Sequence, residues 1–193
     1  MKAAKGKHSL KFTLRIPAWC SEASLSINGK DAGIKLVPGS FVTLDRKWKD
    51  GDLLRLSLPT KACSKTAFGG GVWFERGPIV YCYAIPAEYK KDTERYANMN
   101  GKYPEDDEAF PCWDIRPSGD WNYAVSADSQ PEFEDGVLRI AVRPIEWDFD
   151  KGPKGELLTP RLPARPLPIG AERTLELVPY GGTTLRLTVF PVY

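Results

Sequence analysis

Histidine and closely spaced cysteines are scarce in this chain. Of its 193 residues one is histidine, His8, and four are cysteine, with no Cys-x-x-Cys pair. A structural zinc site needs four closely arranged Cys or His ligands, and a Ser-His-Asp triad cannot be built around one histidine near the start of a chain. We therefore expect no catalytic residue, no metal ligand and no cofactor in this chain. The cysteines are too sparse to imply a disulfide scaffold, although an even count permits two disulfides, and we expect buried free thiols at Cys20, Cys63, Cys82 and Cys112.

The chain also lacks an excess of charge and a long apolar run. Its 27 Lys and Arg against 25 Asp and Glu leave a net charge of +2, with no long block of either sign, so nucleic acid is not an implied partner. No apolar run approaches the roughly 18 residues that would suggest a membrane span. The basic stretch Met1–Lys7 leads into alternating residues instead of the apolar core of a signal peptide. A β pattern this close to the start is typical of a fragment of a longer protein. Any targeting signal would then lie upstream, and the localisation, periplasmic, secreted or cytoplasmic, stays open.

Alternating apolar residues, the pattern of a half-buried β-strand, are abundant. Residues 9–16 place Leu10, Phe12, Leu14 and Ile16 on one face of such a strand. Asn28-Gly29 is a strong hairpin signal. The apolar run 79–85 has β-forming residues on both faces, which indicates a strand buried on both sides. Further strands are expected at residues 23–27, 40–44, 53–58, 121–125, 137–142, 174–178 and 183–190.

These strands predict an all-β fold of two consecutive, mostly antiparallel β-sandwich (jelly-roll-like) domains. We expect the first sandwich at residues 8–86, a connection at 87–111 and a second sandwich-like domain at 112–193, whose last strand returns to the first domain. A short helix around Glu88–Asn98 or a domain junction would account for the length of the connection. The proline-rich residues 159–168 are expected to form an extended strap across a surface.

Two acidic clusters come nearest to the carboxylate pair of a glycosidase. Residues 105–108 have the composition of a solvated loop. In the second cluster, Glu146–Asp150, Trp147 and Phe149 could form a sugar-facing wall beside three carboxylates. Adjacent loop carboxylates are common, however, so we expect a surface or turn role there. Gly69-Gly70-Gly71 lacks the Lys-Ser or Lys-Thr of a phosphate-binding loop and is expected to be a bend.

Six tryptophans and eight tyrosines favour a carbohydrate interpretation, because flat aromatic faces stack on the apolar faces of sugars. The candidate carbohydrate-binding residues are Trp113, Trp121, Tyr123 and Trp147. The alternative, which we favour, is that these large side chains fill β cores and domain seams.

Four motifs in one order resemble the β region that follows the catalytic barrel in glycoside hydrolase family 127. They are Phe12-Thr13-Leu14-Arg15-Ile16-Pro17-Ala18-Trp19, Ile27-Asn28-Gly29, Trp48-Lys49-Asp50-Gly51-Asp52 and Arg76-Gly77-Pro78-Ile79-Val80-Tyr81-Cys82. Trp121-Asn122-Tyr123-Ala124 and the segment Leu177–Arg186 are similar to the C-terminal part of the same proteins. The resemblance thus spans almost the whole chain, apart from residues 86–111 and 148–170.

The resemblance implies a β-L-arabinofuranosidase-like hydrolase whose cysteine nucleophile, glutamate and cysteine-bound zinc lie in an upstream α/α-barrel that this chain lacks. None of the four cysteines lies in a matching motif, so no catalytic residue is carried over. We expect non-catalytic accessory domains that pack on that barrel of the same polypeptide, with a homodimer as a further option. A carbohydrate-binding module that holds a glycan on an exposed aromatic platform is the alternative. A free-standing interaction domain is a third, since fold alone does not fix function.

Overall fold

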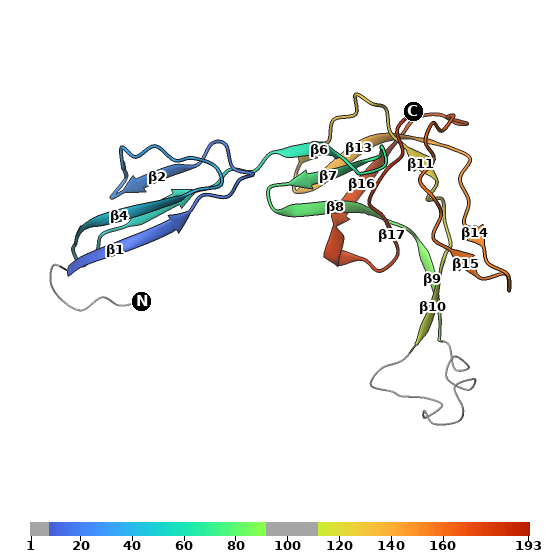
Figure 1. The fold of residues 1–193 in the computed structure, drawn as a ribbon, viewed down its shortest axis with the longest axis horizontal. Helices are drawn as coiled ribbons and strands as arrows, with labels where there is room; N and C mark the ends of the chain where they lie inside the picture. Colours follow the sequence, from blue (N-terminus) through green and yellow to red (C-terminus); the bar gives the residue numbers. More distant parts are fainter. Residues whose placement is uncertain (1–7, 92–111) are drawn as a thin grey trace, which may run out of the picture. The chain divides into compact units, whose positions relative to one another are not determined.

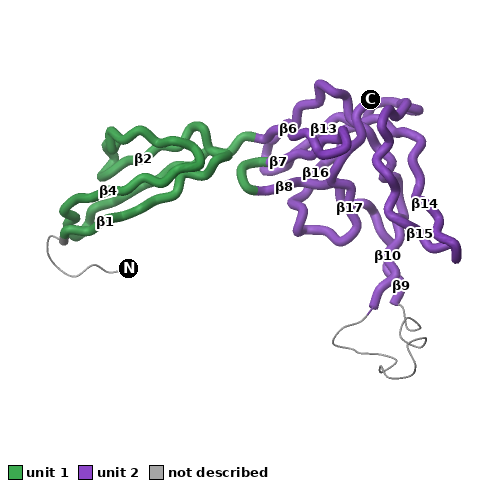
Figure 2. Tube along the Cα trace, viewed as in Figure 1, with its two compact units in different colours: residues 1–61, 76–78 green, residues 62–75, 79–193 purple. Residues whose placement is uncertain are grey.

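The computed structural model describes residues 8–91 and 112–193, which form two compact units. Unit 1 takes in the chain up to Lys61 together with Arg76–Pro78, and unit 2 comprises Ala62–Glu75 and Ile79–Tyr193 (Figure 2). In the described residues the regular structure is seventeen strands and one short 3-10 turn, Tyr180–Gly182, and every pairing of two named strands is antiparallel. The predicted all-β, antiparallel fold class is therefore confirmed.

Unit 1 consists of two small sheets (Figure 1). The strands are β1 (His8–Arg15), β2 (Ser24–Ile27), β3 (Lys30–Asp31), β4 (Phe41–Trp48) and β5 (Leu54–Ser57). β1 pairs with β4 over eight residues, and β2 lies between β3 and β5 in the second sheet. The predicted hairpin turn lies between β2 and β3, where Asn28 and Gly29 have φ angles of 51° and 77°. These left-handed conformations are the ones that an Asn-Gly turn supplies at low cost.

The core of unit 1 covers only one end of the long sheet. Ile16 is fully buried, whereas Phe12 and Leu10, predicted on the same inward face, are 38% and 45% exposed. β2 and β5 are four residues long, half the length of β1 and β4. The shorter sheet therefore cannot cover the far end of the longer one. The prediction of a half-buried strand is right near Ile16 and wrong at Leu10, where the face is open.

Two turns of unit 1 are joined by side-chain hydrogen bonds. Asn28 Nδ2 donates to Asp52 Oδ1 at 2.8 Å, and the backbone N–H of Leu53 donates to Asn28 Oδ1 at 2.8 Å. The other oxygen of Asp52 accepts from the backbone N–H of Lys49 at 3.0 Å. The bond from Asn28, the bond from Lys49 and the nearby charge of Arg46 hold the pKa of the Asp52 carboxyl below its ordinary value.

Unit 2 is organised around an eight-stranded sheet with the order β11-β13-β16-β8-β7-β6, to which β12 and β17 are added. Its strands are β6 (Ala62–Thr66), β7 (Val72–Arg76), β8 (Ile79–Ala84), β11 (Tyr123–Ala124), β12 (Glu132–Glu134), β13 (Val137–Pro144), β16 (Arg173–Pro179) and β17 (Arg186–Leu187). Two strand pairs stand outside this sheet. These are β9 (Ala87–Lys91) with β10 (Trp113–Pro117), and β14 (Asp150–Lys151) with β15 (Leu157–Leu158).

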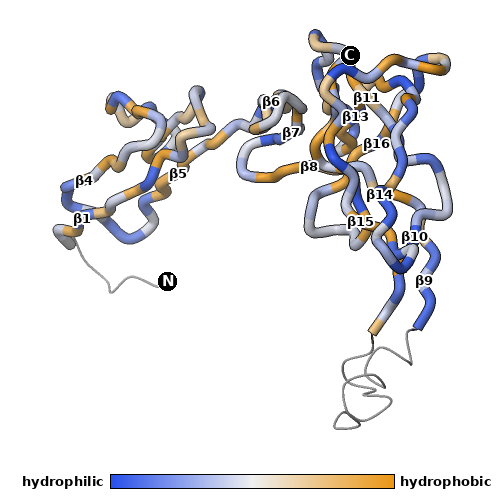
Figure 3. Tube along the Cα trace, turned by 45° about the vertical axis from the view of Figure 1, so that its right-hand side comes forward, coloured by the Kyte–Doolittle hydropathy of each residue, from blue (hydrophilic) through white to orange (hydrophobic). Residues whose placement is uncertain are grey.

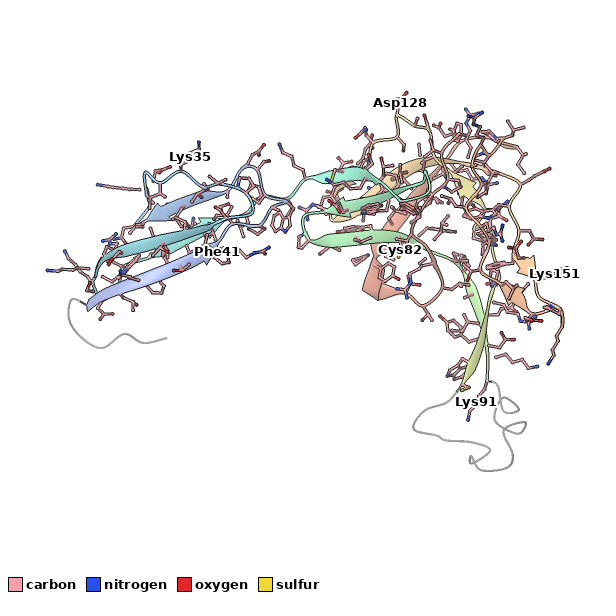
Figure 4. The ribbon with its side chains drawn as sticks, viewed as in Figure 1. Lys35, Phe41, Cys82, Lys91, Asp128 and Lys151 are labelled. Atoms are coloured by element: carbon pink, nitrogen blue, oxygen red, sulfur yellow. The ribbon has the colours of Figure 1, made fainter. Side chains whose placement is uncertain are left out.

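The core of unit 2 follows the predicted alternation. Leu138, Ile140 and Val142 of β13 are buried beside Leu175 and Leu177 of β16. In β8 the consecutive residues Tyr81 and Cys82 are both buried, as expected for a strand covered on both faces, and Figure 3 shows much of this strand as hydrophobic. Figure 4 labels Cys82 in the middle of this unit.

The structure divides the chain after Lys61, whereas the sequence suggested a boundary near residue 86. β6, β7 and β8 belong to unit 2 because β8 pairs with β16 and β17, far along the chain. Residues 87–91, expected to begin a connection or a short helix, are instead strand β9. Residues 92–98 of that expected helix and the acidic cluster 105–108 lie outside the described residues.

Gly77 provides a test of how tightly unit 1 is packed. Its φ angle is +58°, and a Cβ atom there would lie 2.5 Å from Thr60 Cγ2. Gly33, in the same unit, has a φ angle of +67° but nothing within 4 Å of such an atom. We expect Gly33→Ala to lower the free energy of unfolding by about 1–2 kcal/mol through backbone strain alone. Gly77→Ala should cost about 1–3 kcal/mol more because of the clash. Equal losses in urea denaturation would contradict the tight packing.

The contribution of the turn network can be measured with Asn28→Ala. Losing two side-chain hydrogen bonds should lower the free energy of unfolding of unit 1 by about 1–3 kcal/mol, and the strain of alanine at a φ angle of 51° adds about 1–2 kcal/mol. Because the pKa of Asp52 is lowered in the folded state, its stabilisation is present above the ordinary value of 3.8 and is lost as the pH falls through the lowered pKa. Urea denaturation between pH 7 and pH 2 should show this loss in the native chain and not in Asp52→Asn. A parallel decline in both proteins would contradict it.

Candidate functional site

A largely apolar cavity of about 630 Å³ lies in unit 2. This volume is within the range of about 300–1,000 Å³ that is usual for small-molecule sites. Its walls come from the β6–β7 loop, β10, the segment after β13, the β14–β15 hairpin and the last strand region. Six side chains define its apolar wall: Ile85, Trp121, Trp147, Phe149, Leu185 and Leu187.

Three aromatic rings meet in this cavity. The ring centroid of Trp121 lies 5.0 Å from that of Trp147 and 4.6 Å from that of Phe149, with tilted planes. Trp121 precedes β11 and is only 9% exposed, since it packs on the core of unit 2. Trp147 follows β13 and is partly exposed, and its indole N–H donates to the carbonyl of Arg161 at 3.0 Å. That bond ties the ring of Trp147 to the proline-rich strap predicted from the sequence.

One face of the strand pair β9–β10 carries aromatic and apolar side chains together with Lys91, which is the direct partner of Trp113, and the other face is charged. Trp113, Ile115 and Pro117 alternate along β10 and therefore share a face, and Tyr89 is the direct partner of Ile115. The rings of Tyr89 and Trp113 contact each other edge to face at 6.5 Å, and both are about half exposed. The opposite face carries four charged side chains, Glu88, Lys90, Asp114 and Arg116.

Tyr123 occupies a different environment from the three tryptophans. It is buried in the core of unit 2, where its ring contacts Tyr83 edge to face at 5.7 Å. Its hydroxyl accepts a hydrogen bond from Arg173 at 3.4 Å, and the same guanidinium pairs with Asp120 at 3.2 Å. Burial first, and then Tyr123 and Asp120, raise the pKa of Tyr83. The structure therefore brings Trp121 and Trp147 together, places Trp113 on β10 and uses Tyr123 for packing.

The sequence singled out Trp147 and Phe149, and the structure adds Tyr89, Ile115 and the strap residues. Tyr89 could have been found only with the β9–β10 register, because that register places it beside Ile115 and on the same face as Trp113. Glu146, Asp148 and Asp150 are exposed, and Asp148 accepts a hydrogen bond from the backbone N–H of Phe149. Among the described residues, the cavity lining includes no carboxylate.

Two of the four thiols, Cys63 and Cys82, have a raised pKa and are therefore poor nucleophiles. Cys20 and Cys82 are buried, and Cys63 and Cys112 are half-buried. Burial raises the pKa of the Cys82 thiol. Burial and the charge of Glu75, whose Oε1 is 3.7 Å from the sulfur, raise the pKa of Cys63. A reactive thiol needs the opposite shift.

Within residues 8–91 and 112–193 there is no group of three or more His, Cys, Asp or Glu side chains arranged to hold a metal ion. In the same residues, no helix has the length and apolar character that crossing a membrane requires.

The fold and the cavity define an all-β protein of two antiparallel units, one of which carries a cavity lined by aromatic side chains. Residues 1–60 match the family model described as Beta-L-arabinofuranosidase, GH127 middle domain. This match confirms the resemblance to glycoside hydrolase family 127 that was recognised in the motifs. The match lies in the N-terminal third of the chain and names a middle domain, not a C-terminal one. A comparison with curated proteins found no match.

Three solved structures share the fold of nearly the whole chain. A chain titled "Glycoside hydrolase" is 20% identical with a TM-score of 0.51, covering 95% of this chain and 28% of its own. The GH127 β-L-arabinofuranosidase Ara127N-Se from Geobacillus stearothermophilus T6 is 21% identical with a TM-score of 0.53, covering 97% and 27%. The GH127 β-arabinofuranosidase BT3674 is 18% identical with a TM-score of 0.56, covering 100% and 29%. This chain therefore spans less than a third of the length of these proteins.

Proposed function

We propose that this chain is the non-catalytic β portion of a glycoside hydrolase. Its two units pack on and support an α/α-barrel that cleaves L-arabinofuranoside-like substrates. The observation that carries the proposal is the combination of a GH127 middle-domain match with a fold that covers nearly all of this chain but only 27–29% of each solved relative. In this proposal the nucleophile, the glutamate and the zinc belong to the barrel, and no residue of this chain takes part in bond cleavage.

The open end of the long sheet in unit 1 supports packing on another domain. Leu10 and Phe12 share one face of β1, and the ring of Phe12 contacts Trp48 edge to face at 5.1 Å. The guanidinium of Arg46 lies 4.7 Å from the centroid of the Trp48 ring. Apolar and aromatic side chains that remain exposed beside each other on a small unit are typical of surfaces that a partner covers. The catalytic barrel is the partner that we assign to this face.

A carbohydrate-binding module is a second candidate function. The observation that favours it is the cavity of unit 2, where Trp121, Trp147 and Phe149 gather within about 5 Å of one another. The two functions are compatible, because the apolar face of β1 lies in unit 1 and the aromatic cavity lies in unit 2.

The purified chain should hydrolyse no aryl L-arabinofuranoside and no other aryl glycoside. The exposed carboxylates of Glu146 and Asp148 are not held opposite each other across a cavity, as a glycosidase pair would be. Release of nitrophenol from a panel of nitrophenyl glycosides measures this directly. Glu146→Gln and Asp148→Asn are the controls, and turnover that disappears in either variant would overturn the non-catalytic assignment.

The size of the native polypeptide tests the supporting role. An antibody raised against the purified chain should recognise, in cells that produce the protein, a polypeptide several times larger than 21.5 kDa. Limited proteolysis of that polypeptide should release a catalytic fragment without the β portion. This fragment should keep the arabinofuranosidase activity but be less thermally stable than the whole polypeptide. A native polypeptide of 21.5 kDa that co-purifies with no hydrolase would contradict the proposal.

A further inference from the structure

We propose that the cavity of unit 2 and the aromatic face of β9–β10 form one continuous binding track for a glycan chain. The connection between the two is given by β10 itself. Ile115 and Pro117 line the cavity, and Trp113 lies on the same face of the strand two residues before Ile115. A strand rises about 3.3 Å per residue, so the track extends roughly 13 Å from Pro117 to Trp113.

Aromatic side chains stand at both ends of this track. The Tyr89–Trp113 pair stands at one end, 54% and 46% exposed, and the Trp121, Trp147 and Phe149 cluster stands at the other. Sugar rings stack their C–H faces on such surfaces. A polymer with rings at successive positions can occupy both ends at once, whereas a single small molecule cannot. The length of the track therefore favours an oligosaccharide or polysaccharide chain.

The rim of the cavity supplies the polar groups that sugar hydroxyls require. Thr159, Thr184 and Arg186 are among the residues that line the cavity, and the guanidinium of Arg186 also donates to the carbonyl of Tyr180. In the described residues, the one hydrogen bond recorded to the backbone of residues 159–163 is the bond from Trp147 to Arg161. Apart from this bond, the described residues show no hydrogen bond to the backbone of this segment, so its carbonyl groups are available to sugar hydroxyls. An aromatic floor with a polar rim is a chemistry that suits a glycan.

The charged face of β9–β10 provides an internal comparison. Arg116 lies on that face, next to Ile115 in sequence, and pairs with Asp114 at 2.9 Å. It belongs to the same strand as Trp113 but points to the opposite side of the ribbon. A glycan bound along the aromatic face would contact Trp113 and leave Arg116 in solvent.

This inference deepens the proposed function by naming a partner class, and it rests on that function only for the choice of plant polysaccharides as probes. Native gel electrophoresis of the 193-residue chain in gels containing linear arabinan, arabinogalactan or xylan should show retardation by at least one of them. Trp113→Ala should bind that polysaccharide about threefold to tenfold more weakly, and Arg116→Ala should bind as the native chain does. Trp147→Phe, which keeps an apolar ring, tests the cavity end, with circular dichroism to verify folding.

Three results would overturn the glycan track. They are retardation by none of the polysaccharides, equal weakening by Trp113→Ala and Arg116→Ala, or saturable binding of an apolar fluorescent dye in the cavity that no polysaccharide displaces. The last result would indicate an apolar polypeptide as occupant. None of these outcomes affects the size of the native polypeptide or the stability of its catalytic fragment. Failure of the glycan track is thus distinguishable from failure of the supporting role.

Discussion

The pairing of β8 with β16 and β17 is the constraint on which unit 2 depends. β8 pairs through Tyr81 and Cys82 with the end of β16, and through Tyr83 and Ala84 with β17. One six-residue strand thereby receives two segments from the far end of the chain. Its central residues have no access to solvent, so each of their backbone groups needs a partner from these neighbours. The long-range pairing of β8 is therefore obligatory for the sheet.

The same pairing creates the cavity. β17 brings Leu187 and the adjoining Leu185 beside Ile85, which follows β8, and these three side chains form part of the cavity wall. Two hydrogen bonds position Trp121 and Trp147. The backbone N–H of Ile145 donates to the carbonyl of Asn122, and the side-chain amide of Asn122 donates to the carbonyl of Ile145. These bonds join Asn122, which follows Trp121, to Ile145, which lies two residues before Trp147. The two indoles meet because their backbones are joined at this point.

Local signals in the sequence were sufficient for the strands and turns but not for their partners. The Asn28-Gly29 turn, the alternation of β13 and the doubly buried β8 all depend on neighbouring residues, and each was predicted. The boundary after Lys61 was not predicted, because it depends on β8 pairing with a strand almost 100 residues away. The exposure of Leu10 was missed for the same reason, since it depends on the length of a second sheet. Of the candidate site, sequence identified the indoles and could not reveal that Tyr89 joins them.

The recognisable motifs coincide with contacts inside unit 1. Asn28 of one motif bonds Asp52 of another, and a Cβ atom at Gly77 of a third would lie 3.6 Å from Trp19 of the first. Residues that must fit one another in this way tolerate few replacements, which gives a physical reason for their standing out as motifs. In unit 2 the fold depends mainly on apolar alternation, which many side chains satisfy.

The apolar face of β1 in unit 1 and the cavity of unit 2 differ in kind, and the difference bears on the roles that we propose for them. The face around Leu10 and Phe12 is the uncovered end of a sheet, flanked by Arg46 over Trp48, and a sheet face of this sort is complementary to another protein surface. The surface around Trp121 and Trp147 is a cavity whose lining includes Thr159 and Thr184, and a purely apolar cover would leave polar groups of these residues unpaired. Unpaired polar groups cost about 1–3 kcal/mol each when buried. A protein partner on unit 1 and a hydroxyl-rich ligand on unit 2 are therefore the pairings that leave the fewest groups unsatisfied.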